Sequence, residues 1–473
     1  MLAGLLLIVM VPSPQVAAAQ ADWVQMDDMP MNFYGFAYAT LDDDKVLLSM
    51  GLVDVNIFDP DAYTNRTWLF DPATDVWTER SPSPRAYVGA RAVVMPDGNV
   101  YTFGGFRFDV PEVQSEVLIY NYAVDAWSTG ADEPDLMFTQ AVALDDRRIM
   151  LLGGQNSTSS FTTNECYVYD ILADEFRSVD DLPNELAGGV AVNAGGTVYY
   201  IGGSDDSLKA QDEVWRYDAS VNNWGFHGRM PEGRYGDQAV LGGDGLVYMY
   251  GGKTGDTTNS QGRGTFKVLD LRDCSFVTVP DPPMQLSTPG MTATSEGRLV
   301  IFGGSDGDQM SDYVTSLRFF ERDAWIGADE CAPGGSVRLY MNVVMKYAEN
   351  DGFSGTVLLM RNGTIMSSYQ VESPTGGPTS VLMSIPEDLS PGDYDVVIVD
   401  SGTNEFSALS FEPMTLTITD APTPTDRIGE LEDQLDALKE QMDEKMDAWV
   451  GYVLLGLLVV VVIVLVLQMV RKR

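Results

Sequence analysis

About the first 325 residues alternate short apolar segments with turns, and they show no helical period. Six of the apolar segments end in glycine, and the first of these glycines lies at position 51, 104, 153, 202, 251 or 303. A spacing of 49 to 53 residues indicates a repeated unit. Each unit has a proline-containing turn, a strand of small residues, the glycine-ended strand, a variable loop and a strand rich in aromatic residues. The pattern predicts repeated all-β units over residues 22–327.

Each repeat closes on a bulky aromatic residue shortly after its aromatic-rich strand. The closing residues are Trp77, Trp127, Phe176, Trp224, Phe276 and Trp325. A single small sheet cannot bury both of its faces, so neighbouring units must stack around an axis. We therefore expect the closing aromatics to fill the layers between units.

The glycine pairs, the Tyr-Asp pairs and the closing tryptophans together resemble the kelch repeat, over about residues 22–325. The resemblance implies a six-bladed β-propeller of four-stranded antiparallel blades. Two ways of closing the ring stay open. Trp23 is similar to a closing tryptophan, so an N-terminal strand could complete the last blade as a clasp, or the strand that contains Trp325 could do so.

Residues 328–420 have a different pattern. Alternating strands recur at intervals of about 20 residues with Pro-Gly turns between them, which is typical of a small immunoglobulin-like (Ig-like) β-sandwich. A kelch propeller followed by such a sandwich resembles the galactose-oxidase-like superfamily. The predicted fold class is all-β: propeller, Ig-like sandwich, then a helical stalk and one transmembrane helix.

The two ends of the chain predict its location. Residues 1–21 form an apolar run with an Ala-Gln-Ala cleavage pattern, which indicates a signal peptide; an uncleaved anchor or a buried strand are the alternatives. Residues 450–470 are apolar and uncharged and precede a basic tail at 471–473, as expected of a membrane-spanning helix with the tail inside. We expect a single-pass protein of the cell membrane whose main body lies outside the cytoplasm.

Two further segments lie between the sandwich and the predicted span. Residues 421–427 form a stiff Pro/Thr linker. Residues 428–449 place apolar side chains three and four residues apart, which predicts a coiled-coil stalk through which the chain could self-associate.

Charge and composition exclude several classes of function. The chain has 29 basic and 69 acidic residues, a net charge of −40, which argues against a nucleic-acid partner. Its only histidine is His227. The two-imidazole copper site implied by the galactose-oxidase resemblance therefore cannot form, and a Ser-His-Asp triad could be built only on His227.

The loops after the glycine-ended strands are the candidate binding residues, because such loops gather at one mouth of a propeller. They contribute Arg107, Asp109, Asn156, Asp205, Asp206, Lys253, Asp256, Asp306 and Asp308. Polar and acidic loops suit a glycan, a peptide or Ca²⁺, and solvated acidic turns are the alternative. We single out no catalytic residue and expect no other cofactor.

Other residue types predict covalent features and axial contacts. Asn65, Asn156 and Asn362 stand in glycosylation sequons. A Cys274–Cys331 disulfide is a weak prediction, and Cys166 is expected to be a buried thiol. By the kelch resemblance, Arg85 and Arg234 lie near the axis, in a structural ring of hydrogen bonds or in contact with a ligand.

The predicted function is recognition or adhesion at the cell surface, with an extracellular protein or glycan as the partner. The alternative is an extracytoplasmic carbohydrate-active enzyme, a glycan hydrolase or a sugar isomerase, that uses carboxylates at the propeller mouth.

Overall fold

The computed structural model of this chain describes residues 23–156, 161–255, 265–306, 309–347, 353–373, 377–400, 411 and 413–419. The chain divides into two compact units, and the main division falls between Glu321 and Arg322. This is a few residues before the expected boundary at 327.

The first unit consists of antiparallel sheets that follow one another along the chain. The first sheet contains β2 (Ala37–Thr40), β3 (Val46–Leu52), β4 (Tyr63–Asp71) and β5 (Val76–Arg80). The second contains β6 (Arg91–Val94), β7 (Asn99–Phe103), β10 (Glu116–Asn121) and β11 (Ala126–Asp132). The third contains β13 (Gln140–Ala143), β14 (Arg148–Asn156), β15 (Thr162–Asp170) and β16 (Glu175–Ser178), and β12 (Leu136–Met137) also pairs with β14.

The remaining three sheets repeat this plan. The fourth contains β17 (Val190–Ala194), β18 (Thr197–Ile201), β19 (Glu213–Asp218) and β20 (Asn223–Arg229). The fifth contains β21 (Arg234–Leu241), β22 (Leu246–Thr254), β23 (Thr265–Asp270) and β24 (Ser275–Val277). The sixth contains β25 (Gly290–Ala293), β26 (Arg298–Phe302), β27 (Val314–Arg318) and, from the start of the chain, β1 (Val24–Gln25).

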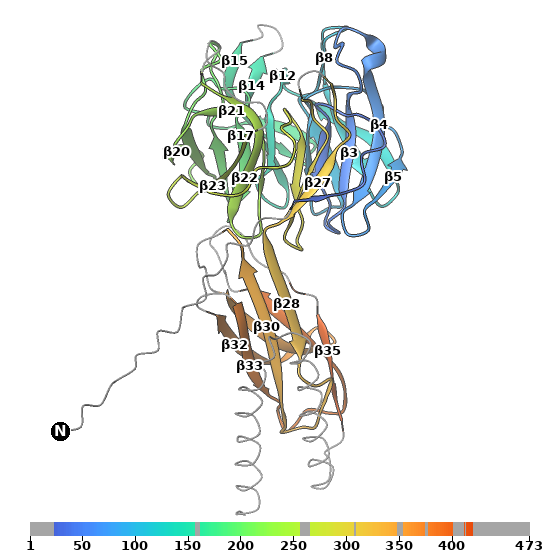
Figure 1. Ribbon diagram of the computed structural model, residues 1–473, viewed down its shortest axis with the longest axis vertical. Coiled ribbons are helices and arrows are strands. Elements are labelled where there is room, and N and C mark those ends of the chain that lie inside the picture. Colours follow the sequence, from blue (N-terminus) through green and yellow to red (C-terminus); the bar gives the residue numbers. More distant parts are fainter. Residues whose placement is uncertain are drawn as a thin grey trace, which may run out of the picture. The chain divides into compact units, whose positions relative to one another are not determined.

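The six sheets surround a central axis as the blades of a β-propeller, which Figure 1 shows from the side. The first strand of each blade contacts the first strand of the next, and a contact between β25 and β2 closes the ring. The all-β propeller predicted by the repeat is therefore confirmed.

The N-terminal strand closes the ring. β1 runs antiparallel to β27 with Val24 opposite Ser316, and the Thr315 hydroxyl donates a hydrogen bond to the Val24 carbonyl at 3.1 Å. Of the two closures considered, the clasp is the one that the structure shows. Trp325 does not close the last blade; it stacks on Tyr340 of the second unit, with ring centroids 5.4 Å apart.

The closing aromatics contact the strand beside them and the preceding blade. Trp77 lies directly opposite Phe70 and stacks on it, with ring centroids 4.4 Å apart. The indole N–H of the closing tryptophan donates to a carbonyl at the end of the preceding blade, as in Trp127 to Ser81 at 2.9 Å and Trp224 to Asp180 at 3.0 Å. Trp23 makes the equivalent bond to Pro280 at 3.1 Å, so it acts as the closing tryptophan of the sixth blade.

A second contact between blades recurs at the turn before the outermost strand. Asp75, Asp125, Asp174 and Asn222 occupy this turn with φ between 51° and 58°, a conformation that Asp and Asn tolerate better than most residues. Each side chain accepts the N–H of a residue at the end of the preceding blade; for Asp125 the donor is Ser81 at 2.9 Å, and the Tyr120 hydroxyl donates to the same oxygen at 2.7 Å. The equivalent residue of the fifth blade is Cys274. We call this contact the interblade pin.

Asp125→Ala removes one interblade pin and leaves the Ser81 N–H and the Tyr120 hydroxyl without their acceptor. We expect the free energy of unfolding to fall by about 1–2 kcal/mol, measured by chemical denaturation of the full chain. Asp42→Ala, in the exposed turn between β2 and β3, is the control and should change stability little. Equal loss in both variants would contradict the role of the pin.

The second unit contains two sheets. Its strands are β28 (Phe320–Ile326), β29 (Glu330–Cys331), β30 (Ser336–Met345), β31 (Phe353–Arg361), β32 (Thr364–Ser373), β33 (Gly377–Ser384), β34 (Gly392–Asp400) and β35 (Met414–Ile418). One sheet has the order β28-β30-β33 and the other β29-β35-β34-β31-β32. Alternate residues of β30 and β34 are buried, as expected when one face of each sheet covers a core. The unit is all-β as expected, and its Ig-like topology stays a prediction.

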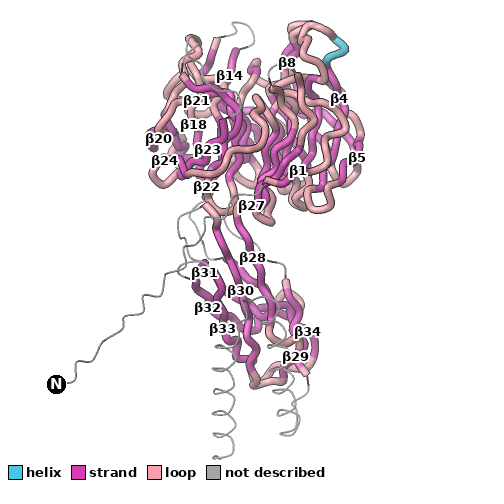
Figure 2. Tube along the Cα trace, in the orientation of Figure 1, coloured by secondary structure: helices cyan, strands magenta, loops and turns pink. Residues whose placement is uncertain are grey.

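Figure 2 shows how little helix the described residues contain: one short 3-10 helix, η1 (Pro60–Ala62). Within the same ranges no helix has the length and apolar character needed to cross a membrane. The predicted signal peptide (1–21), linker (421–427), stalk (428–449), span (450–470) and tail (471–473) lie outside the described residues.

Candidate functional site

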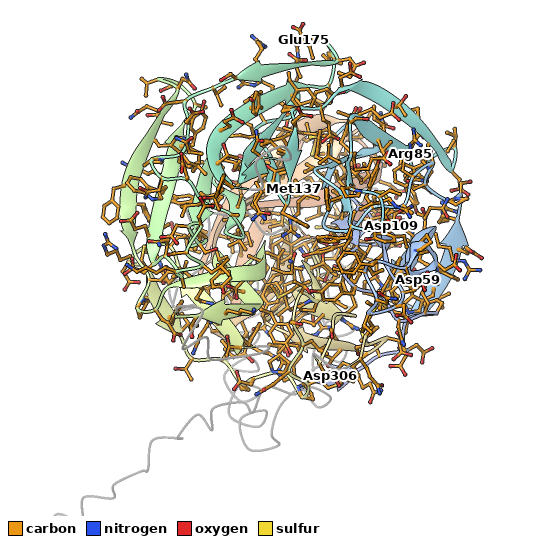
Figure 3. The ribbon with its side chains drawn as sticks, turned by 90° about the horizontal axis from the view of Figure 1, so that it is seen from above. Asp59, Arg85, Asp109, Met137, Glu175 and Asp306 are labelled. Carbon is orange, nitrogen blue, oxygen red and sulfur yellow. The ribbon has the colours of Figure 1, made fainter. Side chains whose placement is uncertain are left out.

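One end of the propeller gathers the longest loops of the repeats. Because neighbouring strands are antiparallel, the loops between second and third strands lie at the same end as the links between blades. This end, which we call the mouth, includes η1 and a hairpin of β8 (Phe106–Arg107) and β9 (Glu112–Val113). Figure 3 looks onto it: Met137 lies near the centre of the ring and Glu175 at its rim.

Glycine ends the second strand because the next blade approaches there. Gly202 has a φ of 66°, and a Cβ atom on it would lie 2.4 Å from the Arg234 carbonyl oxygen. Gly153 has a φ of 54°, and its Cβ would lie 2.6 Å from the Leu186 carbonyl oxygen. The glycines that define the repeat thus bring the blades together below the mouth loops.

Arg107 and Asp109 form a closed ion pair within one mouth loop. The Arg107 Nε donates to Asp109 Oδ1 at 2.9 Å and its Nη2 to Oδ2 at 2.6 Å, and the guanidinium lies 4.4 Å from the centre of the Tyr63 ring of the first blade. Hydrogen bonds from Arg107 hold the pKa of the Asp109 carboxyl below its usual range. The pair therefore joins two loops and does not present an open charge.

Asp205 and Asp206 point to different partners. Asp205 Oδ1 accepts the Ser207 hydroxyl and N–H at 2.6 and 2.9 Å, which lowers the pKa of its carboxyl. Asp206 Oδ1 accepts the Thr162 N–H at 2.7 Å and its hydroxyl at 2.9 Å, a contact with the third blade. The two carboxylates hold loops in place and do not converge on a common point.

The other predicted mouth residues are spread over separate blades. Asn156 lies opposite Leu136 at the end of β14, Lys253 is exposed on β22, and Asp306 Oδ1 accepts the Gln309 N–H at 2.8 Å. Asp256 and Asp308 lie outside the described residues. Among the residues that are described, no three His, Cys, Asp or Glu side chains lie close enough together to hold a metal ion, and Ca²⁺ binding stays a prediction.

The two arginines expected near the axis differ. Arg234 is buried and donates to Asp237, to the Gly251 carbonyl at 3.0 Å and to the Thr265 carbonyl at 3.2 Å, which is the structural role. Arg85 is exposed and lies 4.0 Å from Glu116, and Figure 3 places it away from the centre of the ring.

The predicted covalent sites have distinct environments. Asn362 is exposed in the turn between β31 and β32, whereas Asn65 Nδ2 donates to the Ser83 carbonyl at 2.7 Å. Cys166 is a buried thiol, as expected, and burial raises its pKa to about 12. Cys274 is a thiol buried in the propeller and Cys331 belongs to the second unit, so their disulfide stays a prediction.

The first strands of the blades line a space along the axis. A cavity of about 240 Å³ lies at the mouth and is lined by Tyr34, Phe36, Phe138, Thr288 and neighbouring residues. A second cavity of about 120 Å³ is lined by Ala92, Ala141, Ala191 and Ala239, further along the same strands. The two cavities share Tyr38, Arg91, Gln140 and Gln238, so we treat them as adjoining parts of one axial channel.

The sequence pattern did not single out the polar residues of the axial channel. Arg91, Gln140 and Gln238 occupy the same register position on three blades, opposite the residue before the first glycine of the second strand. Each begins a run of small apolar residues, and this is the signal that could have found them. A polar side chain at the start of an otherwise apolar inner strand has to face either the core or the axis.

The propeller resembles proteins of one repeat family in sequence. No family model matches the chain. Human Kelch-like protein 23 is 24% identical over 188 residues, 39% of this chain and 33% of that protein. Mouse Kelch-like protein 36 is 29% identical over 174 residues (35% and 27%), and human Kelch-like protein 21 is 33% identical over 103 residues (21% and 17%). The chain thus spans about a third of the first of these relatives.

A solved structure shows the same fold. The structure of YjhT matches with a TM-score of 0.51 and 17% identity, over 67% of this chain and 99% of that one. Together with the six glycine-ended repeats, this match decides the architecture. The first unit is a kelch-repeat β-propeller. Among the kelch blades, four close on tryptophan (Trp23, Trp77, Trp127 and Trp224) and two on phenylalanine (Phe176 and Phe276). The first blade has a single glycine, Gly51, where the other blades have a pair.

Arg107→Gln should loosen the mouth hairpin of the second kelch blade, because it removes both hydrogen bonds to Asp109 and the contact with Tyr63. We expect amide hydrogen exchange in residues 106–113 to become roughly ten-fold faster. Arg85→Gln is the control, since an exposed pair 4.0 Å apart contributes little. Unchanged exchange in Arg107→Gln would show that the ion pair does not hold the loop.

Proposed function

We propose that this protein binds a protein partner with the mouth of its kelch-repeat propeller. The observation that carries the proposal is a set of exposed apolar side chains on the mouth loops of four consecutive blades. They are between 44% and 71% exposed: Val55, Phe58, Val110, Phe161 and Leu208. We call them the apolar mouth set.

The placement of the apolar mouth set supports binding. Val55 and Phe58 come from the first blade, Val110 from the second, Phe161 from the third and Leu208 from the fourth. Exposed apolar residues also recur at the other end, in the turns between third and fourth strands, at Val124, Leu172 and Val221, but these side chains are all aliphatic. The mouth set differs because it includes two exposed phenylalanines, and a group of this kind points to an interaction site. Aromatic side chains among them match the composition of protein interfaces.

The polar candidates at the mouth favour binding over catalysis. Asp109, Asp205 and Asp206 each accept hydrogen bonds within the propeller, which leaves none of them as an open acid or base pair. The Kelch-like relatives indicate the fold of the propeller. This chain spans only a third of the first of them, so the binding partners of those proteins are not assigned to it. A glycan partner and a carbohydrate-active enzyme are the alternatives to a protein partner.

Phe58→Ser combined with Phe161→Ser should weaken partner binding without unfolding the propeller. We expect proteins that co-purify with the full chain from its native source to fall at least ten-fold in the double variant. The matched control is Val124→Ser with Leu172→Ser, since these residues are exposed in turns between third and fourth strands, at the other end. Equal recovery with the mouth variant, or an equal loss with the control, would contradict the proposal.

We also propose that the protein is anchored in the cell membrane with both β units outside the cytoplasm. The support is the uncharged segment at 450–470 followed by Arg471, Lys472 and Arg473, together with the apolar N-terminal run. The second unit would then be an Ig-like spacer, and the stalk at 428–449 would allow self-association.

Removal of residues 450–473 tests the anchor. We expect the full chain in the membrane fraction and the shortened chain in the soluble fraction, because the apolar span supplies the membrane affinity. Removal of residues 471–473 alone is the control and should leave the protein in the membrane. A full chain recovered in the soluble fraction would overturn the proposal.

A further inference from the structure

We propose that the axial channel contains a binding site for a small oxyanion, in which Arg91 is the positive group that the anion contacts. The class of ligand is a molecule that presents two oxygens of a carboxylate or a phosphate to one guanidinium. This site is separate from the apolar mouth set and goes beyond the proposed function.

Among the residues that the structure describes, Arg91 is the only charged one that lines either cavity of the axial channel. The remaining lining consists of Tyr38, Gln140 and Gln238 with small, aromatic and other uncharged residues. The chain as a whole has 69 acidic residues, and none of those in the described ranges lines these cavities. An anion in the channel would therefore meet a positive charge and no negative one.

The guanidinium of Arg91 is under-bonded. Its Nη1 donates to Gln238 Oε1 at 2.6 Å, and the Tyr38 hydroxyl donates to the same oxygen at 3.2 Å. Its Nε is fully buried and has no hydrogen-bond partner among the described residues. Burial lowers the pKa of Arg91, and the ionisable groups that act on it are the phenols of Tyr38 and Tyr200.

A partly buried cation without an opposite charge is costly, and the same chain shows the usual solution nearby. Arg234, also in a first strand, is paired with the carboxylate of Asp237 three residues along. Removing a charge from water is unfavourable unless an opposite charge and hydrogen bonds compensate for it. Arg91 has no such carboxylate among the described residues, and a ligand anion would supply it.

Arg91 has an unused hydrogen-bonding edge. Nη1 is held by Gln238 and Nε is enclosed without a partner among the described residues, so a bidentate contact requires the guanidinium to turn its Nε edge toward the cavity. Two parallel N–H···O bonds from one guanidinium are the geometry that Arg makes with carboxylates and phosphates. Thr288 Oγ1, in the lining of the mouth cavity, is also buried and has no hydrogen-bond partner in the part of the chain that the structure describes. The larger cavity beside Arg91, with Tyr34, Phe36 and Phe138 in its wall, leaves room for an uncharged part of the ligand.

The test is calorimetric titration of the full chain with acetate, succinate, inorganic phosphate and sulfate, each at constant ionic strength set with chloride. We expect saturable binding of at least one of these anions to the wild type and at least ten-fold weaker binding to Arg91→Gln. Arg85→Gln, at an exposed arginine, should bind as the wild type does. Tighter binding of acetate or succinate would indicate a carboxylate ligand, and tighter binding of inorganic phosphate would indicate a phosphate ligand.

Thermal unfolding of the same variants separates a ligand role from a structural one. If Arg91 binds a ligand and has no structural role, the melting temperature of Arg91→Gln in chloride should equal or exceed that of the wild type. The binding anion should then raise the melting temperature of the wild type but not that of Arg91→Gln. Gln140→Leu, which keeps the charge but removes an amide from the lining, should weaken anion binding if Arg91→Gln does not fold. Absence of saturable binding to the wild type, or equal binding to Arg91→Gln, would overturn the proposal.

Discussion

Each blade of the propeller depends on its two neighbours to cover its faces. The blades are held together by two repeated contacts: a closing aromatic whose indole N–H reaches the preceding blade, and an interblade pin from an Asp or Asn in a left-handed turn. The first contact excludes water from the layer between blades, and the second satisfies a backbone N–H at its edge. Six blades can be held in this way only if the last one meets the first.

The clasp between β1 and β27 meets this requirement. Trp23 bonds to Pro280 as the other closing tryptophans bond to the blade before them, and β1 supplies the outer strand that β27 would otherwise lack. Antiparallel pairing between the two ends of the repeat ties the start of the propeller to its end. The clasp also leaves Trp325 for the second unit, which explains why the first unit ends before the expected boundary.

Charge is distributed unevenly between the outside and the axis of the propeller. Many acidic side chains lie in turns, where they accept N–H groups of their own loop, as Asp205 does, or of a neighbouring blade, as Asp206 does. The axial channel contains the opposite charge, on Arg91, among amides and phenols. The end of the ring that carries the apolar mouth set also opens onto this channel, so the two proposed sites share one end of the propeller but differ in chemistry.

The sequence by itself determined that the chain has a repeat, that there are six copies of it, and which aromatic residues lie between blades. These features depend on periodic spacing and on residue size. Asp109, Asp205 and Asp206 lie on loops at the mouth, but only the tertiary structure decided what their side chains contact. Arg107 pairs with Asp109, and Asp206 with Thr162, so they do not form the shared polar site that their spacing allowed. The axial channel was decided by the fold alone: Tyr38, Arg91, Gln140 and Gln238 come from four blades, and only the closure of the ring brings their side chains to one axis.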